Sequence, residues 1–217
     1  MKKPLSVGKC HLCEQTVARA SMLRHLSTCG RPSDAKGQTL EPCFHLTVEG
    51  GGKTYWLHVS APVSMPLRKL DKFLRQTWLE CCGHMSAFEI EGTRYASSSC
   101  GGGERSMKVP LGQVATVGTK FFYEYDFGST TELALKVVGL REEVSSKGGV
   151  RLLARNAPPD ILCRGCGEQL ATIICTECAW EGGGEFCEEC AEDHECDDDM
   201  YLPLVNSPRT GVCAYAG

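Results

Sequence analysis

The chain has no long apolar run and no recognisable secretory leader. No stretch of its 217 residues approaches the roughly 18 apolar residues that a membrane-spanning helix needs. Lys2 and Lys3 form a basic pair near the start, but no apolar core follows them, so we expect no signal peptide. The 15 cysteines therefore indicate a reducing compartment, which we take to be the cytoplasm, and metal binding.

Signatures of catalysis are scarce. Asp126-Phe127-Gly128 matches a kinase motif, but the chain has no His-Arg-Asp sequence and no glycine-rich loop before a strand lysine. We interpret Asp126 as a turn-stabilising residue. Cys81-Cys82 ends a predicted helix, where the negative end of the dipole disfavours a thiolate, so we expect a packed or partly exposed pair. An enzyme site that gathers His84, Glu124 and Asp126 is the alternative, and Cys213 has no predicted role.

Paired cysteines dominate residues 163–196. Tetrahedral zinc takes four nitrogen or sulfur ligands, so the eight ligand-type residues here predict two closed, structural sites. Because the pairs are evenly spaced, we favour a cross-brace, in which alternate pairs share an ion. Its first site would contain Cys163, Cys166, Cys187 and Cys190, and its second site Cys175, Cys178, His194 and Cys196. Sequential pairing is the alternative within a zinc module, and disulfides or an iron–sulfur cluster are the alternatives to zinc.

The N-terminal segment predicts a third zinc site, with the ligands Cys10, Cys13, His25 and Cys29. Residues 17–28 have helical spacing, which places His25 and Cys29 on one face. This arrangement resembles the CCHC zinc-finger class. About 30 residues bury too little apolar surface to fold alone, and zinc binding, worth about 10–16 kcal/mol in finger peptides, would stabilise them. We expect residues 31–42 to form a linker.

The middle of the chain predicts an α+β domain. Two strands, 44–48 and 55–59, flank a glycine-rich turn, and an amphipathic helix follows from about Pro66. Further strands are expected at 87–91, 94–97, 119–126 and 132–140. The order of elements predicts a mixed or antiparallel sheet with one main helix. The domains would span residues 1–36, 37–158 and 159–217.

Residues 43–145 resemble the plasmid pRi open-reading-frame-three-like family, whose members are often labelled transposon passenger proteins. The resemblance rests on Trp56-Leu57-His58-Val59, Leu70-Asp71-Lys72-Phe73-Leu74, the stretch 84–88 with Tyr95, and Phe122-Tyr123-Glu124-Tyr125-Asp126-Phe127-Gly128. It implies a roll-like α+β fold. The family form has an aspartate and a tryptophan after Asp-Phe-Gly, where this chain has Ser129, Thr130 and Thr131. The C-terminal metal segment, which ends with residues 205–213, is similar to extensions on zinc-bearing members.

Charge divides the chain into unlike parts. Residues 1–36 contain seven lysines and arginines and two acids, whereas residues 160–200 contain one arginine and thirteen acids. The acidic segment should repel nucleic-acid phosphates and suits a basic protein partner. We predict a non-enzymatic, intracellular zinc-binding protein that acts through an unidentified protein partner. A nucleic-acid-associated protein that uses the basic finger is the alternative.

Overall fold

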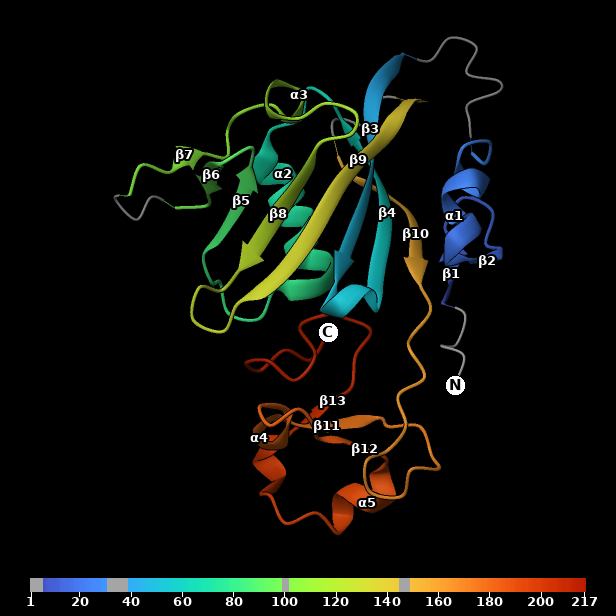
Figure 1. Ribbon diagram of the computed structural model, residues 1–217, viewed down its shortest axis with the longest axis vertical. Helices are drawn as coiled ribbons and strands as arrows, with labels where there is room; N and C mark the ends of the chain where they lie inside the picture. The colour runs from blue at the N-terminus through green and yellow to red at the C-terminus, as the bar shows by residue number, and fades with distance from the viewer. Residues whose placement is uncertain (1–5, 31–38, 99–101, 145–148) are drawn as a thin grey trace.

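The computed structural model describes residues 6–30, 39–98, 102–144 and 149–217. Its main feature is a ten-stranded, mostly antiparallel sheet with the order β2-β1-β10-β4-β3-β9-β8-β5-β6-β7, which confirms the predicted α+β class (Figure 1). The strands are β1 (Val7–Cys10), β2 (Thr16–Ala18), β3 (Leu40–Gly50), β4 (Tyr55–Pro62), β5 (Ser86–Ile90), β6 (Thr93–Ala96), β7 (Arg105–Ser106), β8 (Lys120–Tyr125), β9 (Thr131–Val144) and β10 (Arg151–Asn156). Only the β6–β7 pair is parallel among the pairings described for this sheet.

A second, three-stranded sheet forms the C-terminal module. Its order is β12-β11-β13, with β11 (Ile173–Cys175), β12 (Glu185–Phe186) and β13 (Tyr201–Pro203). The helical elements of the chain are α1 (Arg19–Leu26), η1 (Gly51–Lys53), α2 (Leu67–Leu74), η2 (Arg75–Leu79), α3 (Leu111–Val114), α4 (Thr176–Ala179), α5 (Glu188–Glu192) and η3 (Asp198–Met200). None of the helices in the described ranges has the length and apolar content to cross a bilayer.

The predicted hairpin is strands β3 and β4 at the centre of the main sheet. Strand β4 is buried along its whole length, and its side chains alternate between two cores, as the pleat of a strand requires. Leu57 and Val59 enter the main core, whereas Trp56 enters a smaller core with Met22 of helix α1. Both faces of this strand are therefore covered.

Helix α2 packs on the sheet through one apolar face. It begins after Pro66, as the sequence predicts, and Leu70 and Leu74 are fully buried while Lys72 is exposed. The helix continues as the π-helical turn η2, which buries Trp78 and ends before Cys81. The amphipathic pattern thus predicted the helix, but nothing in that pattern indicated the change of helical type.

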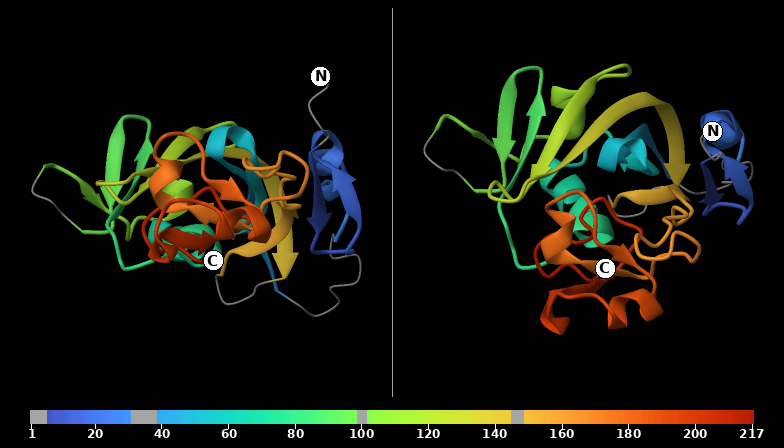
Figure 2. Two further views of the ribbon diagram at one scale, coloured as in Figure 1. Left: turned by 90° about the horizontal axis from the view of Figure 1, so that it is seen from below. Right: turned by 60° about the horizontal axis from the view of Figure 1, so that its bottom comes forward.

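The N-terminal segment is part of the main sheet. Strand β1 pairs with β10, which places Gly8 opposite Asn156, and both Figure 1 and Figure 2 show α1, β1 and β2 beside that edge. A Cβ atom on Gly8 would lie 2.3 Å from the Trp56 ring, so the close approach requires glycine here. The division at 36/37 stays a prediction, and the finger packs against its own chain through the pairing of β1 with β10.

Two predicted loops lie partly outside the described residues. Of the predicted linker, residues 31–38 lie outside, and the prediction is wrong for 40–42, because strand β3 begins at Leu40 and pairs with Val144 of β9. Of the glycine- and serine-rich segment before β7, residues 99–101, including Cys100, lie outside.

The C-terminal tail, residues 204–217, returns from the small module to the main sheet (Figure 1). The Ser207 hydroxyl donates to the Trp78 carbonyl oxygen at 2.6 Å, and both Arg209 and Tyr215 are buried. Residues close to the C-terminus therefore pack against the end of η2, far from them in sequence.

Candidate metal centres

Four groups of cysteine and histidine side chains lie in the described part of the chain. Within each group, the candidate ligand atoms all lie within 4.8 Å of one another. The finger cluster is Cys10, Cys13, His25 and Cys29; the first brace cluster is Cys163, Cys166, Cys187 and Cys190; the second brace cluster is Cys175, Cys178, His194 and Cys196; and the tail cluster is Cys81, Cys82, His84 and Cys213. The first three contain the twelve predicted ligands, and the fourth was not predicted.

The finger cluster is built by a turn that faces a helix. Cys10 ends strand β1, and the chain then reverses through Glu14, which has a φ of 63°. The backbone amide of Glu14 donates a hydrogen bond to the Cys10 carbonyl oxygen and closes the turn. Helix α1 and its last turn supply His25 and Cys29. Cys13 Sγ lies 3.4 Å from His25 Nε2, and Cys10 Sγ lies 3.9 Å from Cys29 Sγ.

These separations match a tetrahedral zinc site. Four ligand atoms placed tetrahedrally about 2.0–2.3 Å from one ion are about 3.3–3.8 Å apart. In the second brace cluster, Cys178 Sγ lies 3.3 Å from His194 Nε2 and 3.8 Å from Cys196 Sγ. The finger cluster and the second brace cluster therefore have ligand separations close to those that the ion requires.

The brace clusters combine alternate cysteine pairs, which is the cross-brace that we favoured over sequential pairing. Their knuckles need glycine for close approach. A Cβ atom on Gly165 would lie 2.9 Å from both Cβ and Sγ of Cys190, and one on Gly184, whose φ is 110°, would lie 2.6 Å from the Cys175 carbonyl oxygen. The backbone is therefore folded tightly around the sulfur atoms.

The pKa values of the thiols in the first brace cluster differ widely. Burial opposes ionisation of Cys163, but the backbone amides of Cys187, Cys166 and Gly165 more than offset it and lower the pKa of this thiol to about 6. Hydrogen bonds from Cys187 and Cys163, together with burial, raise the pKa of Cys190 to about 12. The gathered thiols thus disfavour full ionisation without a positive ion, and metal binding would release their protons.

The residues around His194 also suit a closed site. The Phe186 ring lies 4.4 Å from the His194 ring, centroid to centroid, and Tyr201 lies on strand β13 at 6.2 Å. Every candidate ligand in the three predicted clusters is a sulfur or an imidazole nitrogen, the ligand types that zinc prefers. That these residues bind zinc stays a prediction.

The tail cluster contains residues that were not predicted to be metal ligands. Cys81 is partly exposed, within the expectation of a packed or partly exposed pair, whereas Cys82 is exposed. Both lie with His84 and with Cys213. Cys213 is 131 residues from Cys82 in the chain, and their sulfur atoms are 3.7 Å apart. The local signal was the Cys-Cys-Gly-His sequence, which supplies three candidate ligands; the fourth had no local signal.

The hypothetical enzyme constellation is only partly brought together. His84 Nδ1 lies 3.5 Å from Asp126 Oδ1, but Glu124 pairs with Arg94 at 2.7 Å. Asp126 accepts the Gly128 amide hydrogen, which agrees with the turn-stabilising role, and also binds Arg209. His84 and Asp126 are therefore in contact, whereas Glu124 is paired with Arg94.

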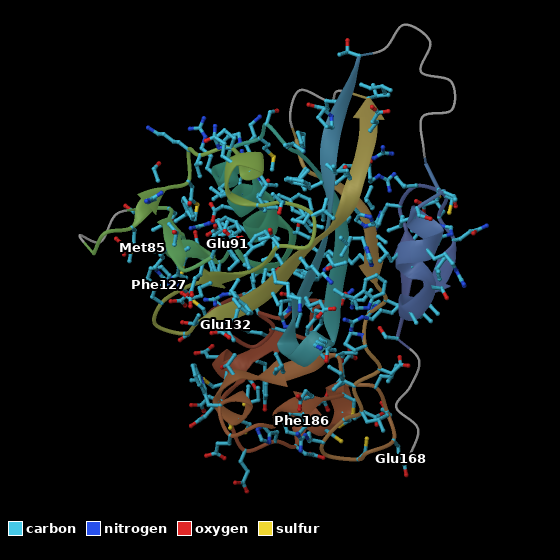
Figure 3. The ribbon with its side chains drawn as sticks, turned by 45° about the horizontal axis from the view of Figure 1, so that its top comes forward. Met85, Glu91, Phe127, Glu132, Glu168 and Phe186 are labelled. Atoms are coloured by element: carbon cyan, nitrogen blue, oxygen red, sulfur yellow. The ribbon has the colours of Figure 1, made fainter. Side chains whose placement is uncertain are left out.

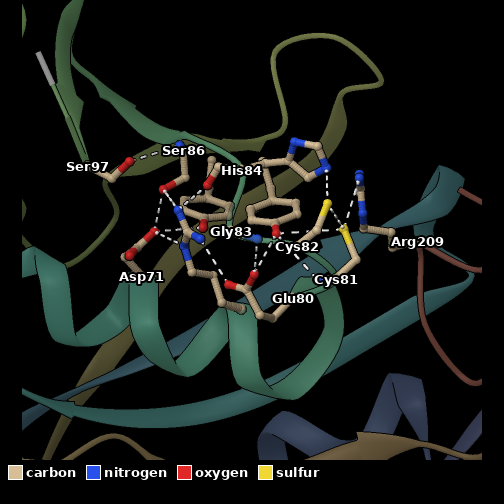
Figure 4. A network of polar contacts seen from close by, with 12 residues as sticks. Asp71, Glu80, Cys81, Cys82, Gly83, His84, Ser86, Ser97 and Arg209 are labelled. Carbon is tan, nitrogen blue, oxygen red and sulfur yellow. Dashed lines mark hydrogen bonds and ion pairs between the residues drawn. The ribbon is translucent and has the colours of Figure 1, made fainter. Parts of the chain in front are cut away.

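A different polar network links helix α2 to strands β5 and β8 (Figure 4). Asp71 Oδ1 accepts hydrogen bonds from Ser86 Oγ at 2.6 Å, from the Tyr123 hydroxyl at 2.8 Å and from Arg75 Nε at 3.2 Å. Burial and the nearby Asp71 carboxylate raise the pKa of Tyr123 well above its usual range. The network satisfies a buried carboxylate and has a structural role.

Two of the basic side chains of the finger already have acidic partners. Lys9 pairs with Glu14, and Arg19 pairs with Glu49 of strand β3. Four further basic residues of the segment 1–36 lie outside the described residues: Lys2, Lys3, Arg31 and Lys36. The paired cations weaken the basis for a nucleic-acid surface on the finger.

The C-terminal module has a strongly acidic, solvated surface. Of the thirteen acids between Asp160 and Asp199, twelve are exposed and one is partly buried. Figure 3 shows Glu168 at the outer edge of this module and Phe186 within it. Trp180 is 72 % exposed and lies just after helix α4, between the exposed acids Glu177 and Glu181.

Comparisons with known proteins do not place the chain in a family. No protein-family model matches it, and no curated protein matches it. Among solved structures, it is similar to a crystal structure described as a protein of unknown function from Methanosarcina mazei Go1, with 21 % sequence identity and a TM-score of 0.44. The match covers 50 % of this chain and 66 % of that one, less than two thirds of its length.

Proposed function

We propose that the chain is a non-enzymatic zinc-binding protein of the cytoplasm, in which zinc holds small modules in shape for contact with a basic protein partner. The observation that carries the proposal is the set of three predicted clusters, each with four protein ligands. A structural zinc site is closed by four protein ligands, whereas a catalytic one keeps a position open for water or substrate. The three clusters have the closed composition.

The proposed contact surface is the acidic module, including the exposed Trp180. Tryptophan is enriched among the residues that dominate binding at protein interfaces. Here its exposed side chain is next in sequence to the exposed Glu181, in a module with twelve exposed acids, whose charge would attract and orient lysine- and arginine-rich segments. The same charges disfavour the phosphate backbone of nucleic acids, so the nucleic-acid alternative would have to use another surface.

The resemblance to the plasmid pRi open-reading-frame-three-like family, and the roll-like fold that it implies, are part of this proposal. They are supported by the residues quoted for the resemblance and by the agreement between the expected strands and β3, β4, β5, β6, β8 and β9. Membership would bring no activity with it.

The structural role of zinc is tested by Cys166→Ala, with Glu168→Gln as a matched control in the same turn. We expect Cys166→Ala to lose the first brace ion and to unfold the module, seen as fast hydrogen exchange in strands β11 to β13. Glu168 is exposed and belongs to neither brace cluster. Glu168→Gln should therefore retain both brace ions and the slow hydrogen exchange of these strands. A Cys166→Ala protein with an unchanged metal count and fold would contradict the proposal.

The partner class is tested with a fluorescently labelled peptide rich in lysine and arginine, titrated with purified protein at low and high salt. We expect salt-sensitive binding that weakens about tenfold or more in Trp180→Ala, as loss of an interface anchor should cause. A labelled acidic peptide and a DNA duplex are the controls. Equal binding of the acidic peptide, or stronger binding of the duplex, would contradict the basic-partner proposal.

A further inference from the structure

The tail cluster has the composition and geometry of a metal site that the cysteine-pair motifs did not predict. Cys82 Sγ lies 3.0 Å from His84 Nε2, 3.7 Å from Cys213 Sγ and 3.8 Å from Cys81 Sγ. All four candidate ligand atoms lie within 4.8 Å of one another. Figure 4 shows the sulfur atoms of Cys81 and Cys82 turned to the same side, with the His84 ring above them.

The sulfur–sulfur separations resemble those of the predicted clusters, whereas the 3.0 Å between Cys82 Sγ and His84 Nε2 is shorter than the sulfur–nitrogen distances of 3.3 and 3.4 Å there. Sulfur–sulfur distances are 3.7 and 3.8 Å in the tail cluster and 3.8 and 3.9 Å in the second brace and finger clusters. Two zinc–sulfur bonds of about 2.3 Å at the tetrahedral angle place the sulfur atoms about 3.8 Å apart, and all four distances lie within about 0.1 Å of that value. A disulfide would instead bring two sulfur atoms to about 2.05 Å. The tail cluster therefore has a gap of the size that an ion would fill.

The backbone is arranged to deliver these ligands. Gly83, with a φ of 82°, turns the chain between Cys82 and His84, and its amide donates to Glu80 Oε1 at 2.7 Å. Cys213 has a φ of 55°, a left-handed conformation that residues other than glycine rarely adopt. An ion bound to Cys213 would account for this unfavourable conformation, because such strain persists where surrounding contacts impose it.

Asp126 and Arg209 contact the candidate ligands from behind, as the residues that orient metal ligands do in known sites. The Asp126 carboxylate faces His84 Nδ1 at 3.5 Å, leaving Nε2 directed at the cysteines. Arg209, which is fully buried, donates to Asp126 Oδ2 at 2.7 Å and lies 3.5 Å from Cys81 Sγ. A carboxylate behind a ligating histidine fixes the ring and its tautomer.

We propose that a fourth zinc ion is bound at the end of η2 by Cys81, Cys82, His84 and Cys213. The site goes beyond the three ions of the proposed function, and it joins parts of the chain that are distant in sequence. Its role is to clamp the tail, residues 204–217, onto the main sheet. The clamp holds Arg209 against Asp126 and Ser207 against Trp78.

The test is the number of zinc ions per chain, measured by native mass spectrometry on full-length protein purified under reducing conditions. We expect four ions in the wild type and three in both Cys213→Ser and Cys82→Ser. Cys213 and Cys82 are exposed, so serine fits without repacking a core. Cys43→Ser is the matched control: Cys43 is a described cysteine outside all four clusters and should leave the count at four.

A second measurement reports on the clamp itself. Trypsin should cleave after the buried Arg209 at least several-fold faster in Cys213→Ser than in the wild type or Cys43→Ser. Equal metal counts in the wild type, Cys213→Ser and Cys82→Ser would overturn the fourth site, whatever the wild-type count. A protein without any zinc would overturn the three predicted sites as well, so the two failures are distinguishable.

Discussion

Arg209 donates to Asp126 at 2.7 Å, and its side chain is completely shielded from solvent. The same guanidinium donates to the Ser129 carbonyl oxygen and to the Thr131 hydroxyl, both at 3.0 Å. A residue eight positions from the C-terminus thus fills a polar pocket between strands β8 and β9. This ion pair connects the tail to the turn whose Asp-Phe-Gly sequence suggests a kinase motif.

Asp126→Asn should destabilise the protein by about 3 kcal/mol or more, because it leaves the buried Arg209 without its counter-ion. The measurement is the free energy of unfolding by denaturant, followed by circular dichroism. Glu124→Gln is the control, since the Arg94–Glu124 pair is partly exposed and should contribute less than about 1 kcal/mol. Equal losses in the two variants would show that Arg209 does not depend on Asp126.

Gly165→Ala should weaken zinc binding at the first brace cluster by about tenfold or more. The added methyl group would lie 2.9 Å from Cys190 Sγ, and relieving that overlap costs about 1–3 kcal/mol. The affinity can be measured by competition with a coloured zinc chelator. Gly183→Ala is the control in the same module, because its methyl group would meet neighbours only at 4.0 Å. Unchanged affinity in Gly165→Ala would argue against an ion between these knuckles.

The buried His45–His58 pair should make stability depend on pH. His45 Nε2 lies 2.9 Å from His58 Nδ1. Burial, with a contribution from Arg141, lowers the pKa of His45 to about 4, and burial with repulsion from His45 lowers that of His58 to about 3. Both rings are thus neutral in the folded protein, while in the unfolded chain they take up protons below about pH 6.5.

The unfolded chain therefore binds more protons between about pH 4 and 6.5, and the free energy of unfolding falls as pH falls through this window. His45 alone should account for a loss of about 2 kcal/mol between pH 7.5 and pH 5. Comparing the wild type with His45→Gln at both pH values isolates this share, since acid release of metal affects both proteins. An identical pH dependence in the two would contradict the neutral, buried His45.

The parts of the protein that could be predicted from sequence are those whose determinants are local. The Cys163/Cys166 pair places two sulfur atoms on one turn, and the spacing from His25 to Cys29 places both on one helical face. Alternation in β4 and the apolar stripe of α2 likewise depend on neighbouring residues. Which pairs share an ion depends on tertiary structure. The even spacing of the pairs therefore favoured the cross-brace but did not exclude sequential pairing.

The features that sequence did not predict involve residues far apart in the chain. Strand β1 of the finger pairs with β10, which lies more than 140 residues away in the sequence, and the finger thereby extends the main sheet. Cys213 meets Cys82 across 131 residues, and no local spacing marks that encounter. The dipole of the preceding helix is the one influence on Cys81 that its sequence neighbours reveal. In the folded protein, the Arg209 guanidinium of the tail also lies 3.5 Å from Cys81 Sγ.

The most direct test of the central claim, that zinc holds the brace module together, is hydrogen exchange of the C-terminal strands before and after metal removal. Reduced protein would be treated with a strong zinc chelator, and the amides of Ile173, Ile174 and Cys175 would be followed by mass spectrometry. We expect these amides to lose their protection when the metal is removed and to regain it when one equivalent of zinc per site is restored. Full protection in the metal-free, reduced protein would contradict the claim.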